Sequence, residues 1–137
     1  MKREAIILFE NTEKTRAVCV DKSAATSILA YINQDDAHKK KFKYIVELIL
    51  KRIRMPELYD KEDINEKCKD ITAMKFFKNG SNGRIYCKEQ SIEDKKYIVI
   101  MSEVLEKKKT QKNNNRINNI LIKIAGYEYE IIKKESE

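Results

Sequence analysis

Only three glycines and one proline interrupt the 137 residues of this chain. These two residue types most often break helices and strands, so their scarcity favours regular structure along most of the sequence. Hydrophobic residues make up 42% of the chain and charged residues 37%, a balance typical of a folded domain and not of a linker or a collagen-like repeat. At this length we expect one domain, residues 1–137, with a core of its own.

Several classes of protein are excluded by missing signals. No apolar run approaches the roughly 18 residues of a membrane span, and the apolar run that follows Glu4 is too short for a signal peptide. The three cysteines are widely spaced and form no Cys-x-x-Cys pair, so neither a zinc ribbon nor a disulfide framework is indicated. No phosphate-binding loop or dinucleotide fingerprint occurs. We therefore expect a soluble, cytoplasmic protein with no cofactor and no metal.

The first half of the chain combines strand and helix patterns. Apolar runs at 5–9 and 16–20 predict two strands that pair as a hairpin. Apolar residues at helical spacing predict a helix over 25–32 and a second, longer helix that Pro56 ends. Because only a short polar break separates these helices, we expect them to pack as an antiparallel hairpin. An acidic stretch with a short helix at about 61–69 follows.

The second half changes to period two. Residues 74–78, 84–88 and 97–101 are predicted strands, and the asparagines at 113–115 precede a helix that Gly126 stops, with an extended tail after it. The predicted fold class is α+β, in which a helical hairpin packs on one face of a small, mostly antiparallel sheet and a helix lies near the C-terminus. Residues 1–21 would form an N-terminal strand or hairpin extension.

The chain carries an excess of positive charge, with 29 Lys and Arg against 22 Asp and Glu, a net charge of +7. Residues 38–54 hold seven Lys and Arg against one Glu, and residues 106–116 hold five against one. Such an excess suits a polyanion or an acidic protein partner, and charge alone does not choose between them.

One predicted strand could present a binding face. Arg84, Tyr86 and Lys88 alternate with Ile85 and Cys87, so they share one side of the strand. Two cations flanking an aromatic ring can hold a phosphate and stack a base, as in single-strand nucleic-acid sites. An ordinary solvated strand face remains the alternative.

A run of lysines follows the last predicted strand. Residues 107–112 read Lys-Lys-Lys-Thr-Gln-Lys and concentrate positive potential on one short segment. Like charges lower one another's pKa, which would help one lysine exchange a proton. The alternative is a solubilising loop, the usual role of lysine runs.

The second half of the chain has a familiar order of elements. A strand and a Gly-rich turn lead to the Gly83–Tyr86 strand, which is followed by an apolar strand, Lys108–Lys112 and a final helix. From about residue 39 to residue 129 this series resembles the RelE/HigB group of the RelE/ParE toxin superfamily. The resemblance implies a toxin of a type II toxin–antitoxin system, an endoribonuclease (mRNA interferase) that cuts mRNA on the ribosome without a cofactor and is inhibited by a cognate antitoxin.

In that mechanism the RNA 2′-hydroxyl attacks the adjacent phosphate, and the protein moves protons and neutralises charge. The resemblance implies that Arg84 clamps the phosphate and that Lys108 and Lys109 bind the backbone, one of them in proton transfer. Tyr129 would donate a proton or stack a base. The expected catalytic residues are thus Arg84, Lys108, Lys109 and Tyr129, and the expected RNA-binding residues are Lys78, Tyr86, Lys88, Lys107 and Lys112.

Two other functions stay open. The chain lacks an evident general base other than lysine or tyrosine, which favours a non-catalytic RNA- or protein-binding domain of the same fold. The third hypothesis is a ParE-like inhibitor of a topoisomerase. The lysine run favours an RNase over this inhibitor.

Overall fold

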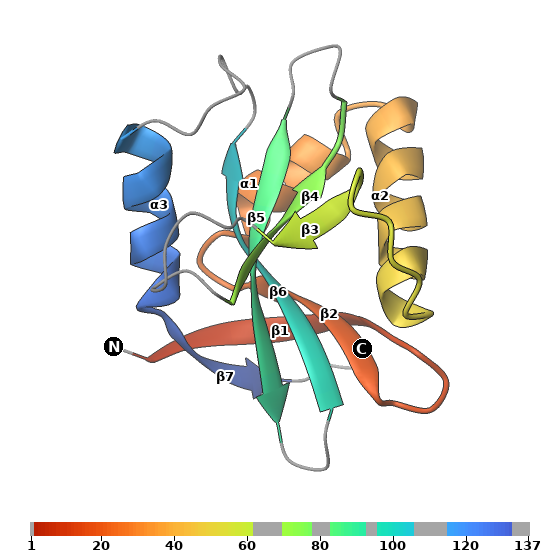
Figure 1. Ribbon diagram of the computed structural model, residues 1–137, viewed down its shortest axis with the longest axis horizontal. Helices are drawn as coiled ribbons and strands as arrows, with labels where there is room; N and C mark the ends of the chain where they lie inside the picture. The colour runs from red at the N-terminus through yellow and green to blue at the C-terminus, as the bar shows by residue number, and fades with distance from the viewer. Residues whose placement is uncertain (1, 62–69, 78–82, 93–95, 106–114, 133–137) are drawn as a thin grey trace.

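The computed structural model describes residues 2–61, 70–77, 83–92, 96–105 and 115–132. In these residues the chain forms one seven-stranded sheet and three helices (Figure 1). The strands are β1 (Lys2–Glu10), β2 (Arg16–Asp21), β3 (Tyr59–Lys61), β4 (Ile71–Lys75), β5 (Arg84–Ile92), β6 (Lys96–Leu105) and β7 (Glu128–Ile132). The helices are α1 (Ala25–Ile32), α2 (Asp36–Leu50) and α3 (Asn115–Ala125).

The sheet is mixed, with the order β3-β4-β5-β6-β2-β1-β7. The hairpins β1–β2, β3–β4, β4–β5 and β5–β6 are antiparallel, whereas β2 runs parallel to β6 and β1 runs parallel to β7. The two parallel pairings join strands from opposite ends of the chain. The N-terminal strands, expected as an extension, therefore lie inside the sheet, with β2 between β1 and β6.

The predicted fold class is wrong. A seven-stranded sheet dominates the structure, and it is not a small sheet under a helical hairpin. Helices α1 and α2 follow each other in sequence but do not run side by side (Figure 1). They cover one face of the sheet, while α3 packs on the other. The physical reason is that β1, β2 and β7 add to the sheet through parallel pairing, which requires partners distant in sequence and leaves no local pattern.

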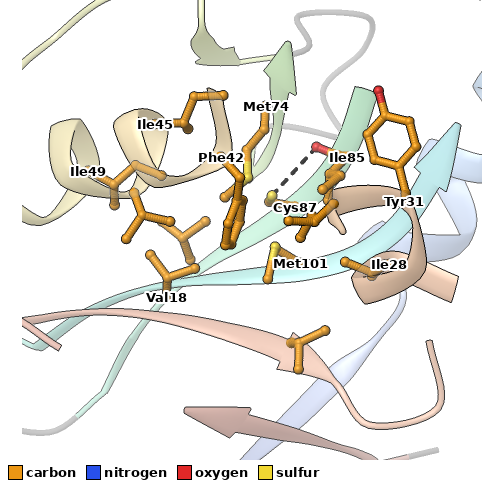
Figure 2. Packing of buried hydrophobic residues seen from close by; sticks show 14 of the residues in the cluster. Val18, Ile28, Tyr31, Phe42, Ile45, Ile49, Met74, Ile85, Cys87 and Met101 are labelled. Carbon is orange, nitrogen blue, oxygen red and sulfur yellow. Dashed lines mark hydrogen bonds between the residues drawn. The ribbon is translucent and has the colours of Figure 1, made fainter. Parts of the chain in front are cut away.

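The main core lies between α1, α2 and the sheet face that carries Val18, Ile85, Cys87 and Met101 (Figure 2). The apolar stripe of α2 supplies Phe42, Ile45, Val46 and Ile49 to this core, as its helical spacing predicts. The helix was expected to run on to Pro56, but α2 ends at Leu50, and Ile53 beyond it is 51% exposed.

The opposite face forms two smaller clusters. Under α3, the ring of Tyr86 packs with Ile71, Leu105 and Leu121. Farther along, the sheet curls so that β7 comes close to β5. Two hydrogen bonds show this approach: the Lys88 ammonium donates to the carbonyl of Tyr127, and the Gln90 amide donates to that of Tyr129 at 3.5 Å. Burial of both faces explains the near-continuous apolar runs of β2 and β6.

Candidate functional site

A hollow of about 300 Å³ lies between the C-terminal end of α2 and the sheet face formed by β3, β4, β5 and β6. We call it the Glu89 pocket. Its apolar wall comes mainly from the end of α2 and the segment after it. Its polar lining consists of Arg16, Arg52, Arg54, Tyr59, Asp60, Lys61, Thr72, Glu89 and Tyr97. The pocket thus joins four cations and two carboxylates to several hydroxyls, in a volume within the range of small-ligand sites.

The carboxylate of Glu89 is the centre of the polar network. Tyr59 donates its phenol proton to Glu89 Oε2 at 2.7 Å, and the Tyr97 phenol donates to the same oxygen. Thr72 Oγ1 in turn donates to the Tyr59 phenol oxygen at 2.8 Å. Among the described residues no side chain donates to Glu89 Oε1. The two phenols therefore hold the Oε2 atom of the carboxylate in place.

Both phenols stay protonated well into the alkaline range. Burial raises the pKa of Tyr59, and the negative charge of the nearby Glu89 carboxylate adds to the effect. Burial also raises the pKa of Tyr97, reinforced by its hydrogen bond to Glu89. At neutral pH the two groups are hydrogen-bond donors that orient Glu89.

Arg16 is fixed against the same network. Its guanidinium carbon lies 4.2 Å from the centre of the Tyr97 ring, a cation–π contact, and its Nε donates to the carbonyl of Ile49 at 2.5 Å. Burial lowers its pKa, although Tyr97 opposes the effect, and an arginine remains charged. Because Nε is used inside the protein, the two terminal nitrogens are the ones left for an anion.

Arg52 is an exposed residue that lines the pocket, and its backbone conformation is unusual. Its φ is 60°, in the left-handed region where glycine is normally found. Two backbone bonds, from the amide of Arg52 to the carbonyl of Ile49 and from that of Ile53 to Leu48, define a Schellman motif that ends α2. The position after such a helix end usually holds glycine, so an arginine here carries a backbone cost of order 1 kcal/mol.

Four of the sequence-predicted site residues are described, and none of them lines the Glu89 pocket: Arg84, Tyr86, Lys88 and Tyr129. The predicted alternation is confirmed, since Ile85 and Cys87 pack toward α1 and α2 while Tyr86 packs under α3. The Tyr86 side is not a solvated face, however. Tyr86 is fully buried and Arg84 is 8% exposed, so a base would reach the ring only if α3 moved away.

Lys88 and Tyr129 serve the fold in this structure. The Lys88 ammonium donates to the carbonyl of Ala125 at 3.0 Å, which satisfies the C-terminal end of α3, and burial lowers its pKa. Tyr129 is buried, with its phenol 2.7 Å from Asp21 Oδ2 and 2.9 Å from Ser102 Oγ. Its pKa is raised, chiefly by burial. Neither side chain lines the Glu89 pocket.

The remaining expected residues, Lys78, Lys107, Lys108, Lys109 and Lys112, lie outside the described residues. Their roles stay predictions. Arg84 and Glu89, both on β5, point to opposite faces of the sheet, because Arg84 shares the Lys88 side and Glu89 the Cys87 side.

Sequence reasoning missed Glu89 because the predicted strand stops at Lys88, whereas β5 continues to Ile92. Extending the alternation by one residue would have placed a carboxylate on the face opposite Lys88, but nothing local indicates that Tyr59 and Tyr97 converge on it. Among the described residues, no three His, Cys, Asp or Glu side chains are grouped closely enough to hold a metal ion. In the same part of the chain, every helix is too short or too polar to cross a membrane.

No family model, curated protein or solved structure matches this chain. The resemblance to RelE/HigB toxins therefore stays a prediction from one short motif, and the site itself has to carry the functional argument.

Proposed function

We propose that this chain binds single-stranded RNA at the Glu89 pocket and cleaves it without a metal, by attack of a ribose 2′-hydroxyl on the neighbouring phosphodiester. The observation that carries the proposal is the convergence of an oriented carboxylate with a fixed arginine in one hollow. Two phenols hold Glu89 Oε2, and Arg16 is stacked on one of those phenols. A carboxylate to take a proton and a cation to meet a phosphate are what this reaction needs.

The steps assign one role to each group. Glu89 accepts the proton of the 2′-hydroxyl, the 2′-oxygen forms a bond to phosphorus, and the bond to the 5′-oxygen breaks. The leaving oxygen takes its proton from water, and the products carry a 2′,3′-cyclic phosphate and a 5′-hydroxyl. Arg16 neutralises the charge that develops on the phosphate oxygens, because its guanidinium is charged at any working pH. In this proposal Glu89 is the general base that could not be recognised from the sequence alone.

The wider charge distribution supports an RNA substrate. The net charge of +7 attracts polyanions, and residues 38–54, seven of them Lys or Arg, include the end of α2 beside the pocket. A role as the toxin of a toxin–antitoxin pair, acting on translating ribosomes and held inactive by an antitoxin, rests on the Lys108–Lys112 motif alone. The antiparallel helical hairpin, which was also expected from the resemblance to RelE/HigB toxins, does not occur among the described residues.

The test is cleavage of an end-labelled single-stranded RNA in EDTA, alongside primer extension on an mRNA in a bacterial translation reaction. We expect cuts that leave cyclic phosphates, and none where the substrate carries a 2′-O-methyl group. Glu89→Gln should lower the rate by about 10²–10⁴-fold, the usual contribution of a general base. Glu130→Gln, an exposed carboxylate on β7, is the matched control. Intact RNA in both reactions, or equal rates for Glu89→Gln and wild type, would overturn the proposal.

A further inference from the structure

A second hollow of about 580 Å³ adjoins the Glu89 pocket. We call it the turn hollow, because it lies between the β1–β2 turn and α2. Its charged lining consists of Glu10, Glu13, Arg16, Glu47, Lys51 and Arg52. Two residues line both hollows, namely Arg16 and Arg52. The two hollows therefore adjoin at these two arginines, and we call this boundary the ridge.

The two hollows differ in their chemistry. Around the Glu89 pocket four cations face two carboxylates, whereas the turn hollow has three of each, its carboxylates being Glu10, Glu13 and Glu47. Of these, Glu10 is paired with Lys96. Carboxylates repel a phosphate but accept hydrogen bonds from the amino groups of adenine, cytosine and guanine. The ridge suits a phosphate, and the turn hollow suits a base with an amino group.

The backbone at Arg52 points the same way. A glycine would close the Schellman motif at the end of α2 without a steric cost, yet an exposed arginine with φ 60° occupies the position. This conformation is disfavoured for a residue with a Cβ, and such conformations cluster at binding sites. Here the disfavoured backbone conformation is accepted at a position where the side chain brings a guanidinium to the ridge.

We propose that the two hollows form one groove for a dinucleotide step of single-stranded RNA, in which Arg52 contacts the phosphate between the two nucleotides and the turn hollow receives a base with an amino group. This inference rests on the proposed function, since it assigns the substrate's path through the same site. Arg52 acts here as a binding residue, and Glu89 remains the proton acceptor.

Calorimetry with uncleavable ligands tests the groove. The probes are adenosine 3′-monophosphate, the 2′-O-methyl dinucleotide ApA and its UpU counterpart. We expect ApA to bind wild-type protein at least tenfold more tightly than the mononucleotide does, and more tightly than UpU. Arg52→Gly should remove most of that tenfold gain and raise Tm by a few degrees, because glycine relieves the left-handed backbone. Arg52→Lys should keep part of the gain.

Lys14→Gly is the matched control, since Lys14 also has a left-handed backbone, with φ 58°, and lines neither hollow. It should raise Tm in the same way and leave the affinity for ApA unchanged. Equal affinities of wild type for ApA and the mononucleotide, or an unchanged ApA affinity in Arg52→Gly, would overturn the groove even if RNA is still cut. If no ligand binds and no RNA is cut, the proposed function fails together with it.

Discussion

Replacing Tyr129 by Phe tests whether this residue stabilises the fold or takes part in chemistry. Its phenol belongs to a buried network on the curled side of the sheet, in which the carboxylate of Asp21 is fully buried. Asp21 Oδ2 accepts from the phenol and from Arg3 Nε, both at 2.7 Å, and Oδ1 accepts from the amide of Ser23 at 2.7 Å. Phenylalanine keeps the ring and removes one donor to a buried charge.

The cost follows from the partners that remain. A hydrogen bond to a charged group is worth about 1.5–3 kcal/mol, and Arg3 and Ser23 continue to hold Asp21 after the change, so we expect a loss of about 2 kcal/mol. For 137 residues the unfolding entropy of about 2.1 cal/mol/K per residue converts this loss into a fall in Tm of about 7 °C.

The loss should also depend on pH. Burial opposes the ionisation of Asp21, but the hydrogen bonds from Arg3, Tyr129 and Ser23 together outweigh it and lower the pKa of this carboxyl. A depressed folded-state pKa contributes stability above the ordinary Asp value, near 3.9, and the contribution disappears as pH falls through the folded pKa. The difference between wild type and Tyr129→Phe should therefore be full at pH 7 and shrink toward pH 2.

Urea unfolding followed by circular dichroism at pH 7 and at pH 3 or below measures both effects. Tyr127→Phe is the control, because that ring packs on Arg3 at 4.1 Å and no hydrogen bond of its phenol occurs among the described residues. Cleavage by Tyr129→Phe, assayed well below its Tm, should match wild type. A variant as stable as wild type that has lost activity would refute the structural role and restore Tyr129 as a catalytic candidate.

Two further stability predictions concern helix ends. Lys88→Met removes the ammonium that donates to the carbonyls of Ala125 and Tyr127, and should cost about 1–3 kcal/mol in urea unfolding, since it leaves those acceptors unsatisfied. Asp35→Ala removes the cap of α2, whose carboxylate accepts from the amide of His38 at 2.8 Å, and should cost about 1 kcal/mol by the same measurement. Asp35→Asn, which can still cap, should lose much less, and an equal loss in both variants would contradict the capping role.

The positions of most elements could be predicted because their signals are local. Helix α3 begins at the asparagines that were expected to precede it and ends before Gly126. Strands β1 and β2 contain the apolar runs from which they were predicted. Strand β3 was missed because it has only three residues, Tyr59–Lys61, too few for a strand pattern to stand out. The early end of α2 was missed because a Schellman motif is normally signalled by glycine, and this one uses Arg52.

Sheet order and the site could not be predicted, for a common reason. The parallel registers Val18↔Val99 and Ala5↔Ile131 join residues far apart in sequence, and a buried strand carries no mark of its neighbour. These pairings decide which face each side chain occupies. Helix α3 covers Tyr86, which removes the expected binding face, while the end of α2 leaves Glu89 at the floor of a hollow.

Alkaline titration offers a direct check that the Glu89 pocket is formed in solution. Burial raises the pKa of Tyr59, Tyr97 and Tyr129, so these phenols stabilise the fold below pH 10 and the contribution is lost as pH rises through the folded values. Absorbance at 295 nm should show at least three of the seven tyrosines silent at pH 10.5 in folded protein. All seven should titrate near pH 10 in guanidinium.

Replacing one pocket phenol makes this titration specific. Tyr97→Phe should lower the number of silent phenols by one. Tyr44→Phe, which removes a 44% exposed ring of α2 that does not line the pocket, is the control substitution. If Tyr97→Phe instead removes a normally titrating phenol, then Tyr97 is open to solvent and does not hold Glu89. The oriented carboxylate would then be lost from the proposal, and with it the reason to expect a general base in this pocket.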